Sequence, residues 1–338
     1  MPFVQESMSF PSGVMQINFA TSISCRIAEL RSRYRQLALA RVAKSAYHRL
    51  TRRIFLIYRA WLSVRFRVRN SVLRMLPISV CVDGVEFVLH PRGEIAFNIW
   101  TEFQVERREL DFVLHALSVE AIFFDIGANV GLFTLAAGQK LRTNGGRVYA
   151  FEPCSETFEV LQQNVHLNGL RNVNPVHAAL TDWIGEGTLH VNKSFRDGLN
   201  TLGTPSHFDC SVIGSQVVPT TTIDHFMKAN EIGRVDVMKV DVEGAELLVF
   251  AGGRRLLERN DAPVILYEGY SWCTAGFNYH PVEIMWLLKD FGYELFIIDP
   301  DSRRLVPRIR DGQYDRMIIA MKRGDPRFGT LLKYEASR

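Results

Sequence analysis

Short apolar runs alternate with amphipathic stretches between residues 121 and 321. The short runs have the composition of buried strands, whereas the amphipathic stretches have helical spacing. Strand followed by helix, repeated several times, predicts an α/β fold with a mostly parallel sheet. The predicted strands are 121–126, 146–151, 173–178, 235–241, 263–268, 293–298 and 315–321, and the predicted helices run to about 141 and over 155–168, 222–230, 243–258 and 281–291.

Two parts of the pattern depart from this alternation. The last two predicted strands follow each other without a helix, which predicts a closing antiparallel pair. Residues 185–219 form β-like pieces at 187–192 and 215–219 around a stretch rich in Gly and Ser. We interpret this segment as an insertion near the substrate side of the sheet, or as a lid.

The residues before the sheet predict a smaller N-terminal addition to the same domain. Asp83-Gly84 separates two short β-prone runs within 80–89, which is a hairpin signal, and 98–117 has helical spacing. We therefore expect one domain over 80–322. It is divided into a hairpin and helix at 80–120 and a core at 121–322, with a C-terminal tail at 323–338.

The first 80 residues differ sharply in charge from the rest. They hold 14 Lys and Arg against two acids, and the remainder holds 26 against 34, so a net charge of +12 precedes one of −8. Residues 1–25 lack Lys and Arg and are predicted to be disordered, whereas 26–79 predicts a basic helical arm. Arginines with Trp and Phe between them favour either peripheral contact of residues 26–74 with an anionic membrane or packing on the domain.

Composition excludes several classes of protein. No apolar run approaches the roughly 18 residues of a membrane span. Five widely spaced cysteines indicate reduced thiols, a cytoplasmic protein and no zinc site. The acidic domain argues against nucleic acid as a partner.

The first predicted strand runs into a glycine turn, Asp125-Ile-Gly127-Ala-Asn-Val-Gly131, and then into a helix. Ligands of such sheets bind at the carboxyl ends of the strands. A dinucleotide site requires Gly-x-Gly-x-x-Gly, but Asn129 stands where the second glycine would be. An acid followed by Gly-x-x-x-Gly suits S-adenosylmethionine, which carries positive charge and no phosphate, so Asp125, Gly127, Ala128, Asn129 and Gly131 are the predicted contacts.

The next predicted strand ends at Glu152. A carboxylate at this position can accept hydrogen bonds from both hydroxyls of a ribose, so Glu152 is the remaining predicted cofactor contact. The alternative is a surface glutamate that begins the following helix.

A second group of polar residues, Lys239, Asp241 and Glu243, lies at the end of the fourth predicted strand. Methyl transfer to a hydroxyl requires an aligned acceptor oxygen and a proton acceptor. Asp241 or Glu243 could take the proton, and Lys239 could stabilise the incipient alkoxide. The alternative is a structural ion pair with a helix N-cap.

Glu268 ends the fifth predicted strand and is the fourth candidate for the reaction. With Asp241 it could orient a polyol or bind a divalent cation, although no metal site is predicted. Three histidines are weaker candidates for a base, and three aromatic residues could form a sugar-stacking wall or part of the core. The histidines are His177, His225 and His280, and the aromatic residues are Trp272, Phe277 and Tyr279.

The motifs at 125–131, 149–153, 168–172, 222–224 and 238–246 together resemble the FkbM family of S-adenosylmethionine-dependent methyltransferases. The resemblance covers about residues 80–322. It implies a Rossmann-like class I fold, in which a seven-stranded, mostly parallel sheet has helices on both faces and an antiparallel last strand. It also implies methyl transfer to oxygen, commonly to a hydroxyl of a sugar or a polyketide-type product, with cofactor contacts at Asp125, Gly127, Gly131 and Glu152. The basic arm has no counterpart in the family pattern.

The sequence therefore predicts an O-methyltransferase whose acceptor is a small molecule, a glycan or a lipid-linked glycan. Two other functions stay open. A non-catalytic module could keep the cofactor fold and bind a membrane or protein through its arm, and a nicotinamide-dependent oxidoreductase is opposed by the missing Gly-x-Gly.

Overall fold

The computed structural model describes residues 61, 64, 78–82, 84–89, 106–192, 197–205, 212–299, 302–307 and 317–335. The predictions for 1–25 and for the basic arm at 26–79 lie outside these residues, apart from positions 61, 64 and the start of the first strand. No helix in these ranges combines the length and the apolar character needed to cross a membrane.

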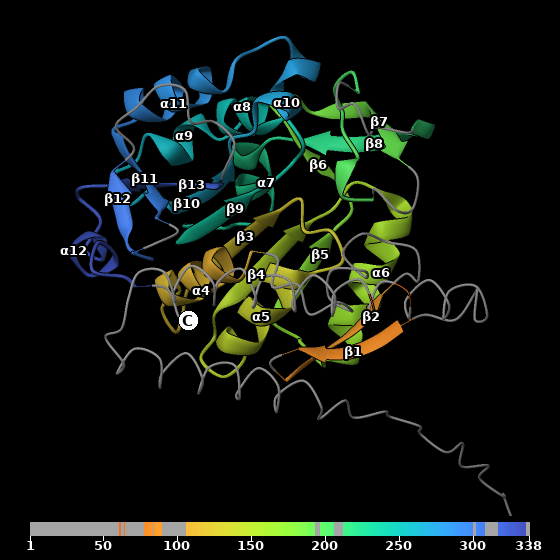
Figure 1. The fold of residues 1–338 in the computed structure, drawn as a ribbon, viewed down its shortest axis with the longest axis horizontal. Helices are drawn as coiled ribbons and strands as arrows, with labels where there is room; N and C mark the ends of the chain where they lie inside the picture. The colour runs from red at the N-terminus through yellow and green to blue at the C-terminus, as the bar shows by residue number, and fades with distance from the viewer. Residues whose placement is uncertain are drawn as a thin grey trace, which may run out of the picture. The chain divides into compact units, whose positions relative to one another are not determined.

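The central sheet has the order β12-β11-β13-β10-β9-β3-β4-β5 (Figure 1). β3, β4, β5, β9 and β10 pair in parallel, and β13 is antiparallel to both β10 and β11. This confirms the class I methyltransferase topology with its antiparallel last strand, while β12 adds an eighth strand at the edge. The strands are β3 (Ile122–Ile126), β4 (Arg147–Phe151), β5 (Val173–Val176), β9 (Val237–Val240), β10 (Val264–Glu268), β11 (Tyr293–Ile298), β12 (Leu305–Pro307) and β13 (Met317–Lys322).

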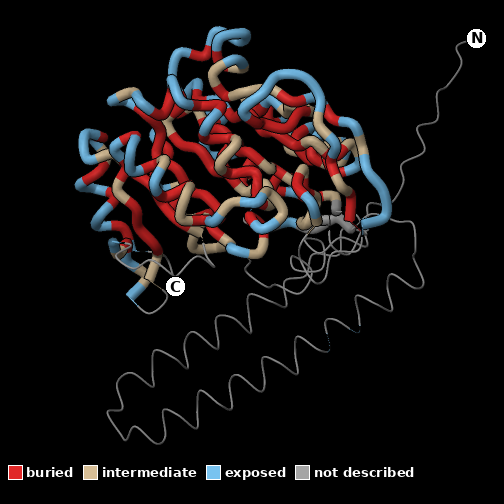
Figure 2. Tube along the Cα trace, turned by 90° about the horizontal axis from the view of Figure 1, so that it is seen from above, coloured by how far each residue is buried: buried red, intermediate tan, exposed pale blue. Residues whose placement is uncertain are grey.

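Helices cover both faces of this sheet because neighbouring strand residues point to opposite faces. Phe123 belongs to the core cluster that includes residues of α4, α5, α6 and α12, whereas Phe124 belongs to the cluster that includes residues of α7, α8, α9 and α11. Figure 2 shows the buried residues concentrated in the interior strands between these layers. The helices are α4 (Arg107–Ala116), α5 (Leu132–Leu141), α6 (Ser155–Leu167), α7 (Ile223–Ala229), α8 (Glu246–Ala251), α9 (Arg254–Leu257), α10 (Ser271–Thr274), α11 (Pro281–Asp290) and α12 (Phe328–Leu331), with 3-10 turns η1 (Asp197–Leu199) and η2 (Ala275–Phe277).

Two smaller β-structures accompany the central sheet. The predicted hairpin is present as β1 (Ile78–Val82) and β2 (Val85–Leu89), and the side chain of Asn168 bonds both the N–H and the carbonyl of Glu86. The predicted insertion contains β7 (Gly185–Asn192) and β8 (Val212–Thr221), which form a three-stranded sheet with β6 (Ala179–Leu180).

The prediction of one helix over 243–258 is wrong. The chain turns before α8 and breaks again between α8 and α9 at Gly252 and Gly253. A Cβ atom on Gly252 would lie 2.0 Å from the carbonyl oxygen of Thr181, so the close approach of another segment requires glycine there. The predicted helix 98–117 is present from Arg107 onward, and residues 98–105 are outside the described ranges.

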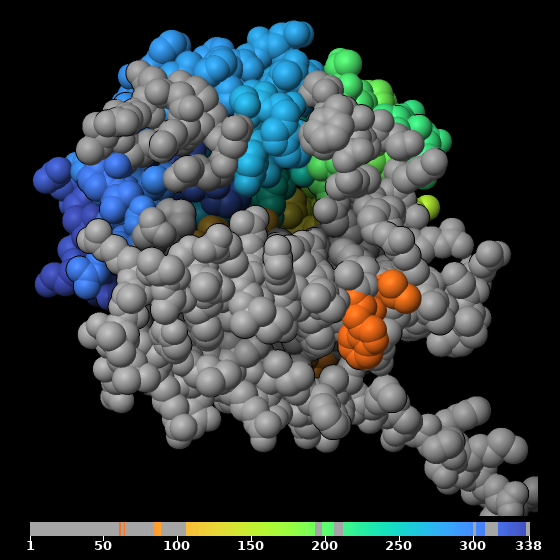
Figure 3. All heavy atoms as spheres, viewed as in Figure 1, coloured from red at the N-terminus to blue at the C-terminus, as the bar shows by residue number. Residues whose placement is uncertain are grey.

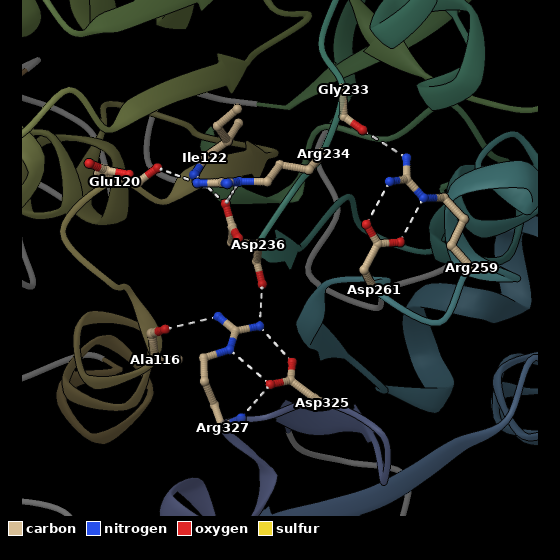
Figure 4. Close-up of polar contacts among 10 residues, drawn as sticks. All are labelled: Ala116, Glu120, Ile122, Gly233, Arg234, Asp236, Arg259, Asp261, Asp325 and Arg327. Carbon is tan, nitrogen blue, oxygen red and sulfur yellow. Dashed lines mark hydrogen bonds and ion pairs between the residues drawn. The ribbon is translucent and has the colours of Figure 1, made fainter.

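The C-terminal segment is attached at the amino ends of the central strands, whereas the glycine turn lies at their carboxyl ends. Arg327 pairs with Asp325 and donates hydrogen bonds to the carbonyl oxygens of Ala116 and Asp236 (Figure 4). The Asp236 carboxylate in turn accepts from the N–H of Ile122 and from Arg234. These contacts connect the starts of β3 and β9 to α4 and to the segment preceding α12.

Candidate active site

The glycine turn after β3 is held against two neighbouring strands. The N–H groups of Gly127 and Ala128 donate to the carbonyl oxygen of Phe151, at 3.0 and 2.9 Å. Gly127 has φ +76°, and a Cβ atom on it would lie 1.8 Å from the carbonyl oxygen of Asp241. Gly131, at φ +101°, would likewise bring a Cβ atom within 2.9 Å of Leu161. Glycine is therefore required at both positions, because a side chain would collide with the neighbouring segments.

Glu152 is fixed beside this turn at the end of β4. Its two carboxylate oxygens accept from the N–H groups of Asn129 (3.0 Å) and Cys154 (2.9 Å). Asn129 adopts φ +50°, and its side chain accepts from the N–H of Val130. Burial raises the pKa of Glu152 to about 7, although the hydrogen bonds from the two N–H groups by themselves lower it. The carboxylate is oriented by two bonds and keeps lone pairs for ribose hydroxyls.

Asp125 lies beneath the turn and is completely buried. One carboxylate oxygen, Oδ2, accepts from the hydroxyl of Thr134 at 2.5 Å, and Oδ1 lies 3.9 Å from Nζ of Lys239. Among the described residues, Oδ1 accepts no hydrogen bond. Burial raises the pKa of Asp125, and the charge of Lys239 opposes this effect. Asp125 thus supplies buried negative charge below the predicted cofactor site.

Lys239 connects the two predicted sites. Its ammonium group donates to the carbonyl oxygen of Gly127 at 2.9 Å and lies 3.0 Å from Oδ2 of Asp241. The same group stands over the ring of Phe133, 5.4 Å from its centroid. The neighbouring carboxylates raise its pKa despite burial, so Lys239 stays charged. These contacts favour the ion-pair interpretation: Lys239 holds the turn and Asp241 together.

The predicted acceptor side lies at the carboxyl ends of β9 and β10. The side chain of Asp241 is 20% exposed, whereas Glu268 is buried. Cys273, in α10, places its sulfur 3.4 Å from a carboxylate oxygen of both Glu243 and Glu268. Burial, and next the Asp241 carboxylate, raise the pKa values of Glu243 and Glu268 well above the ordinary range.

The backbone turn after β9 explains how these side chains meet. Glu243 adopts φ +53° and Gly244 φ +103°, where a Cβ atom would lie 2.3 Å from the carbonyl oxygen of Cys273. Glu246 accepts from the N–H groups of Val242 and Gly244. The N-cap considered for this cluster is not present at α8, whose N-cap residue is Ala245. Glu246 instead holds the turn before α8, and Gly244 allows α10 to approach Glu243.

Sequence reasoning missed three residues of this site. Cys273 and Thr134 contact the predicted carboxylates, and Glu106 faces them from the N-terminus of α4. Burial, and next the negative charge of Asp241, raise the pKa of Glu106 to about 7. None of the three belongs to a motif, so no local signal identifies them.

The three candidate histidines do not join the cluster of carboxylates. Nε2 of His177 lies 3.0 Å from the carbonyl oxygen of Pro153, and its ring stacks on Phe158, which fits a structural role. His225 is exposed on α7, and His280 caps α11. The hydroxyl of Tyr279 donates to the carbonyl oxygen of Gly244. Phe277 lies against Gly244, and Trp272 is near Tyr270. Tyr279 is partly buried against the core, whereas Phe277 belongs to no core cluster of the described residues, and the sugar-stacking wall stays a prediction.

The donor set fits S-adenosylmethionine. The glycine turn suits close contact of the backbone with the cofactor. Oδ1 of Asp125, which accepts no hydrogen bond from the described residues, suits its positive charge. The oriented carboxylate of Glu152 suits its ribose. Carboxylates also outnumber cations in this region of the described structure, since Lys239 alone faces Asp125, Asp241 and Glu243. When bound, the cofactor supplies an activated methyl group.

Comparison with known proteins also indicates a methyltransferase. Residues 125–295 match the model of the methyltransferase FkbM domain. The chain is 25% identical over 163 residues to the hexuronic acid methyltransferase AglP of Haloferax volcanii, covering 48% of this chain and 62% of AglP. It is 28% identical over 151 residues to methyltransferase 1 of Beauveria bassiana, covering 39% and 58%. The chain thus spans about three fifths of these relatives.

A crystal structure of a methyltransferase FkbM from Methylobacillus flagellatus aligns with 67% of this chain and 52% of its own, at 18% identity and a TM-score of 0.39. The family match spans the glycine turn, Glu152, the Lys239–Glu246 block and Glu268. The chain belongs to the FkbM family of S-adenosylmethionine-dependent methyltransferases.

Proposed function

We propose that this protein transfers a methyl group from S-adenosylmethionine to a hydroxyl oxygen of a sugar or glycan. The observation that carries the proposal is the group of carboxylates beside the glycine turn, in which Asp241 is partly exposed and both Glu243 and Glu268 contact the sulfur of Cys273. Carboxylates pair with the hydroxyl groups of polyols. The similarity to AglP, a hexuronic acid methyltransferase, supports a sugar acceptor.

In this proposal the residues of the chain position the reactants and accept one proton. Lys239 holds Asp241 beside the turn, so that Asp241 can accept a hydrogen bond from the acceptor hydroxyl. As the hydroxyl oxygen gains the methyl group, its proton passes to the Asp241 carboxylate and then to water. Asp125 and Glu152 orient the cofactor on the other side of the turn.

A hexuronic acid offers two acceptors, a hydroxyl and a carboxylate. We infer that the hydroxyl is the acceptor, because an anionic acceptor would lie beside the Asp241 carboxylate. Methylation of the hydroxyl gives an ether, which survives mild alkali, whereas methylation of the carboxylate gives an ester, which does not.

The test uses methyl-labelled cofactor with neutral hexosides, hexuronides and lipid-linked glycans. We expect label in neutral sugars that persists after mild alkali. Asp241→Asn should lower kcat/KM about 10²-fold or more while cofactor binding by calorimetry persists. The exposed Asp290→Asn on α11 is the matched control. Label found only in alkali-labile form, or unchanged rates in the Asp241 variant, would exclude this mechanism.

A separate part of the proposal concerns the basic arm and the place in the cell where the protein binds its acceptor. The arginines of the arm would bring the domain to anionic lipid, where lipid-linked glycans are found. Replacement of Arg65, Arg67 and Arg69 by Gln in the full chain should weaken sedimentation with anionic vesicles and leave turnover of a free hexoside unchanged. Equal sedimentation of the variant and the wild type would argue for packing on the domain.

A further inference from the structure

A segment of the insertion reaches from β7 to the turn after β9. Thr201 pairs with His190 of β7 through two backbone hydrogen bonds of 2.8 and 3.2 Å. Its hydroxyl donates to the carbonyl oxygen of Glu243 at 2.9 Å and accepts from the N–H of Gly203 at 3.1 Å. The Gly203 donor leaves the hydroxyl hydrogen available for Glu243. Because Thr201 is only 7% exposed, little water competes for this bond.

The bond is made at the point where Glu243 leaves regular backbone geometry. A glutamate at φ +53° is uncommon and is held by its surroundings. This conformation directs the carboxylate of Glu243 toward Cys273, whose sulfur is 3.4 Å away. A carbonyl fixed by Thr201 therefore restricts the rotation that would move the side chain of Glu243 out of the acceptor site.

A second contact holds the same segment on the opposite side of the cluster. The N–H of Thr204 donates to the carbonyl oxygen of Gly276 at 2.9 Å. A Cβ atom on Gly276 would lie 2.2 Å from the carbonyl oxygen of Thr204, and one on Gly203 would lie 2.5 Å from Phe277. Figure 3 shows the green surface of the insertion next to the cyan surface that contains α10. The insertion is thus attached both at Glu243 and just after Cys273.

We propose that Thr201 is a positioning residue for Glu243, through which the β6–β8–β7 sheet sets the geometry of the acceptor site. The inference rests on the proposed function in assigning Glu243 to the acceptor side. Thr201 touches neither reactant and acts through one backbone carbonyl. The sheet then contributes to acceptor selection without contributing a side chain to the chemistry.

Thr201→Val tests the proposal, because valine keeps the shape of threonine and removes the donor. We expect acceptor kcat/KM to fall roughly tenfold, since the Glu243 carbonyl is left without its buried donor. Cofactor affinity by calorimetry should stay within about twofold. Thr201→Ser keeps the hydroxyl and should restore most of the acceptor kcat/KM, which a role in packing alone would not explain.

Thr220 provides the matched control. It is another buried threonine of the same sheet, and its hydroxyl has no hydrogen-bond partner among the described residues. Thr220→Val should leave acceptor kinetics unchanged. Equal losses in the Thr201 and Thr220 variants, or failure of serine to rescue, would overturn the proposal.

A measurement without turnover separates this inference from the proposed function. Carbon-13 NMR of labelled glutamate, assigned with Glu243→Gln, reports the titration of Glu243. This group faces Lys239 from β9, Asp241 just after β9, Glu246 from α8, Glu268 from β10 and Cys273 from α10. Thr201→Val should change the pH midpoint of the Glu243 titration, whereas Thr201→Ser should leave it unchanged. If no sugar is methylated but this pattern holds, only the acceptor assignment fails; an unchanged midpoint in Thr201→Val overturns the role of Thr201.

Discussion

The ammonium group of Lys239 donates a 2.9 Å hydrogen bond to the carbonyl oxygen of Gly127, which ties the fourth parallel strand to the cofactor turn. The same ammonium group is 3.0 Å from Asp241, on the acceptor side. One buried cation therefore connects the turn proposed to bind the cofactor with the carboxylate proposed to bind the acceptor. In this proposal the distance between cofactor and acceptor depends on this connection, because methyl transfer requires close alignment.

Lys239→Met should weaken both folding and cofactor binding. Asp125 would keep its burial and lose its nearest cation, which we expect to cost about 3 kcal/mol in the free energy of unfolding. The turn at Gly127 would also lose a hydrogen bond. Urea denaturation and calorimetry with S-adenosylmethionine measure the two effects, and Lys289→Met, on the exposed face of α11, is the control. Wild-type cofactor affinity in the Lys239 variant would contradict the connecting role.

Gly127→Ala should abolish cofactor binding. A Cβ atom there would lie 1.8 Å from the Asp241 carbonyl oxygen, so the turn or the end of β9 must move. Gly145→Ala is a matched control, because Gly145 has a similar φ of +80° and no atom within 4 Å of the added carbon. The control should lose only about 1 kcal/mol from left-handed strain and keep its cofactor affinity. Similar affinities in the two variants would show that the close contact has no functional effect.

The strand ends could be located from the sequence, whereas the contacts between distant segments could not. Short apolar runs place Asp125, Glu152 and Glu268 at the carboxyl ends of strands, because hydrophobic periodicity is a local property. Cys273 and Thr201 reach the same carboxylates only through the packing of α10 and of the insertion. No spacing in the sequence encodes either contact.

The break between α8 and α9 has the same origin. The apolar spacing over 243–258 is helical, so a single helix was the reasonable expectation. The backbone of Thr181 approaches Gly252 too closely for a side chain, and this tertiary contact ends α8. Gly252 and Gly253 were the available signal, since consecutive glycines disfavour a continuous helix.

Cofactor affinity should depend on pH through Glu152. Burial raises its pKa to about 7, so the native protein holds this proton up to about pH 7, whereas the unfolded chain loses it near the ordinary value of 4.5. The free protein therefore loses stability as pH rises between these values. Ribose hydroxyls and the positive cofactor favour the ionised form, so affinity should rise roughly tenfold per pH unit below about 7 and level off above it.

Calorimetry across this range, in buffers of different ionisation enthalpy, should show release of a proton on binding below about pH 7. Glu152→Gln should remove most of the pH dependence. Glu156→Gln, exposed in the first turn of α6, should leave it unchanged. A pH profile of wild-type shape in the Glu152 variant would assign the dependence to another carboxyl, such as Glu106 or Glu246.

Arg327→Lys should destabilise the fold without changing the chemistry. Arg327 binds Asp325 through two nitrogens and also reaches the carbonyl oxygens of Ala116 and Asp236, a set of bonds that the single ammonium of lysine cannot reproduce (Figure 4). We expect a loss of about 2 kcal/mol in the free energy of unfolding, because two partly buried carbonyl groups lose a donor. Arg323→Lys, whose side chain is 78% exposed beside Glu294, should cost less than about 0.5 kcal/mol. Arg327 lies at the amino ends of the strands, whereas the glycine turn lies at their carboxyl ends. At a temperature where both variants are folded, their kcat should therefore equal that of the wild type. A lower kcat in Arg327→Lys would mean that the C-terminal segment influences the carboxyl ends of the strands.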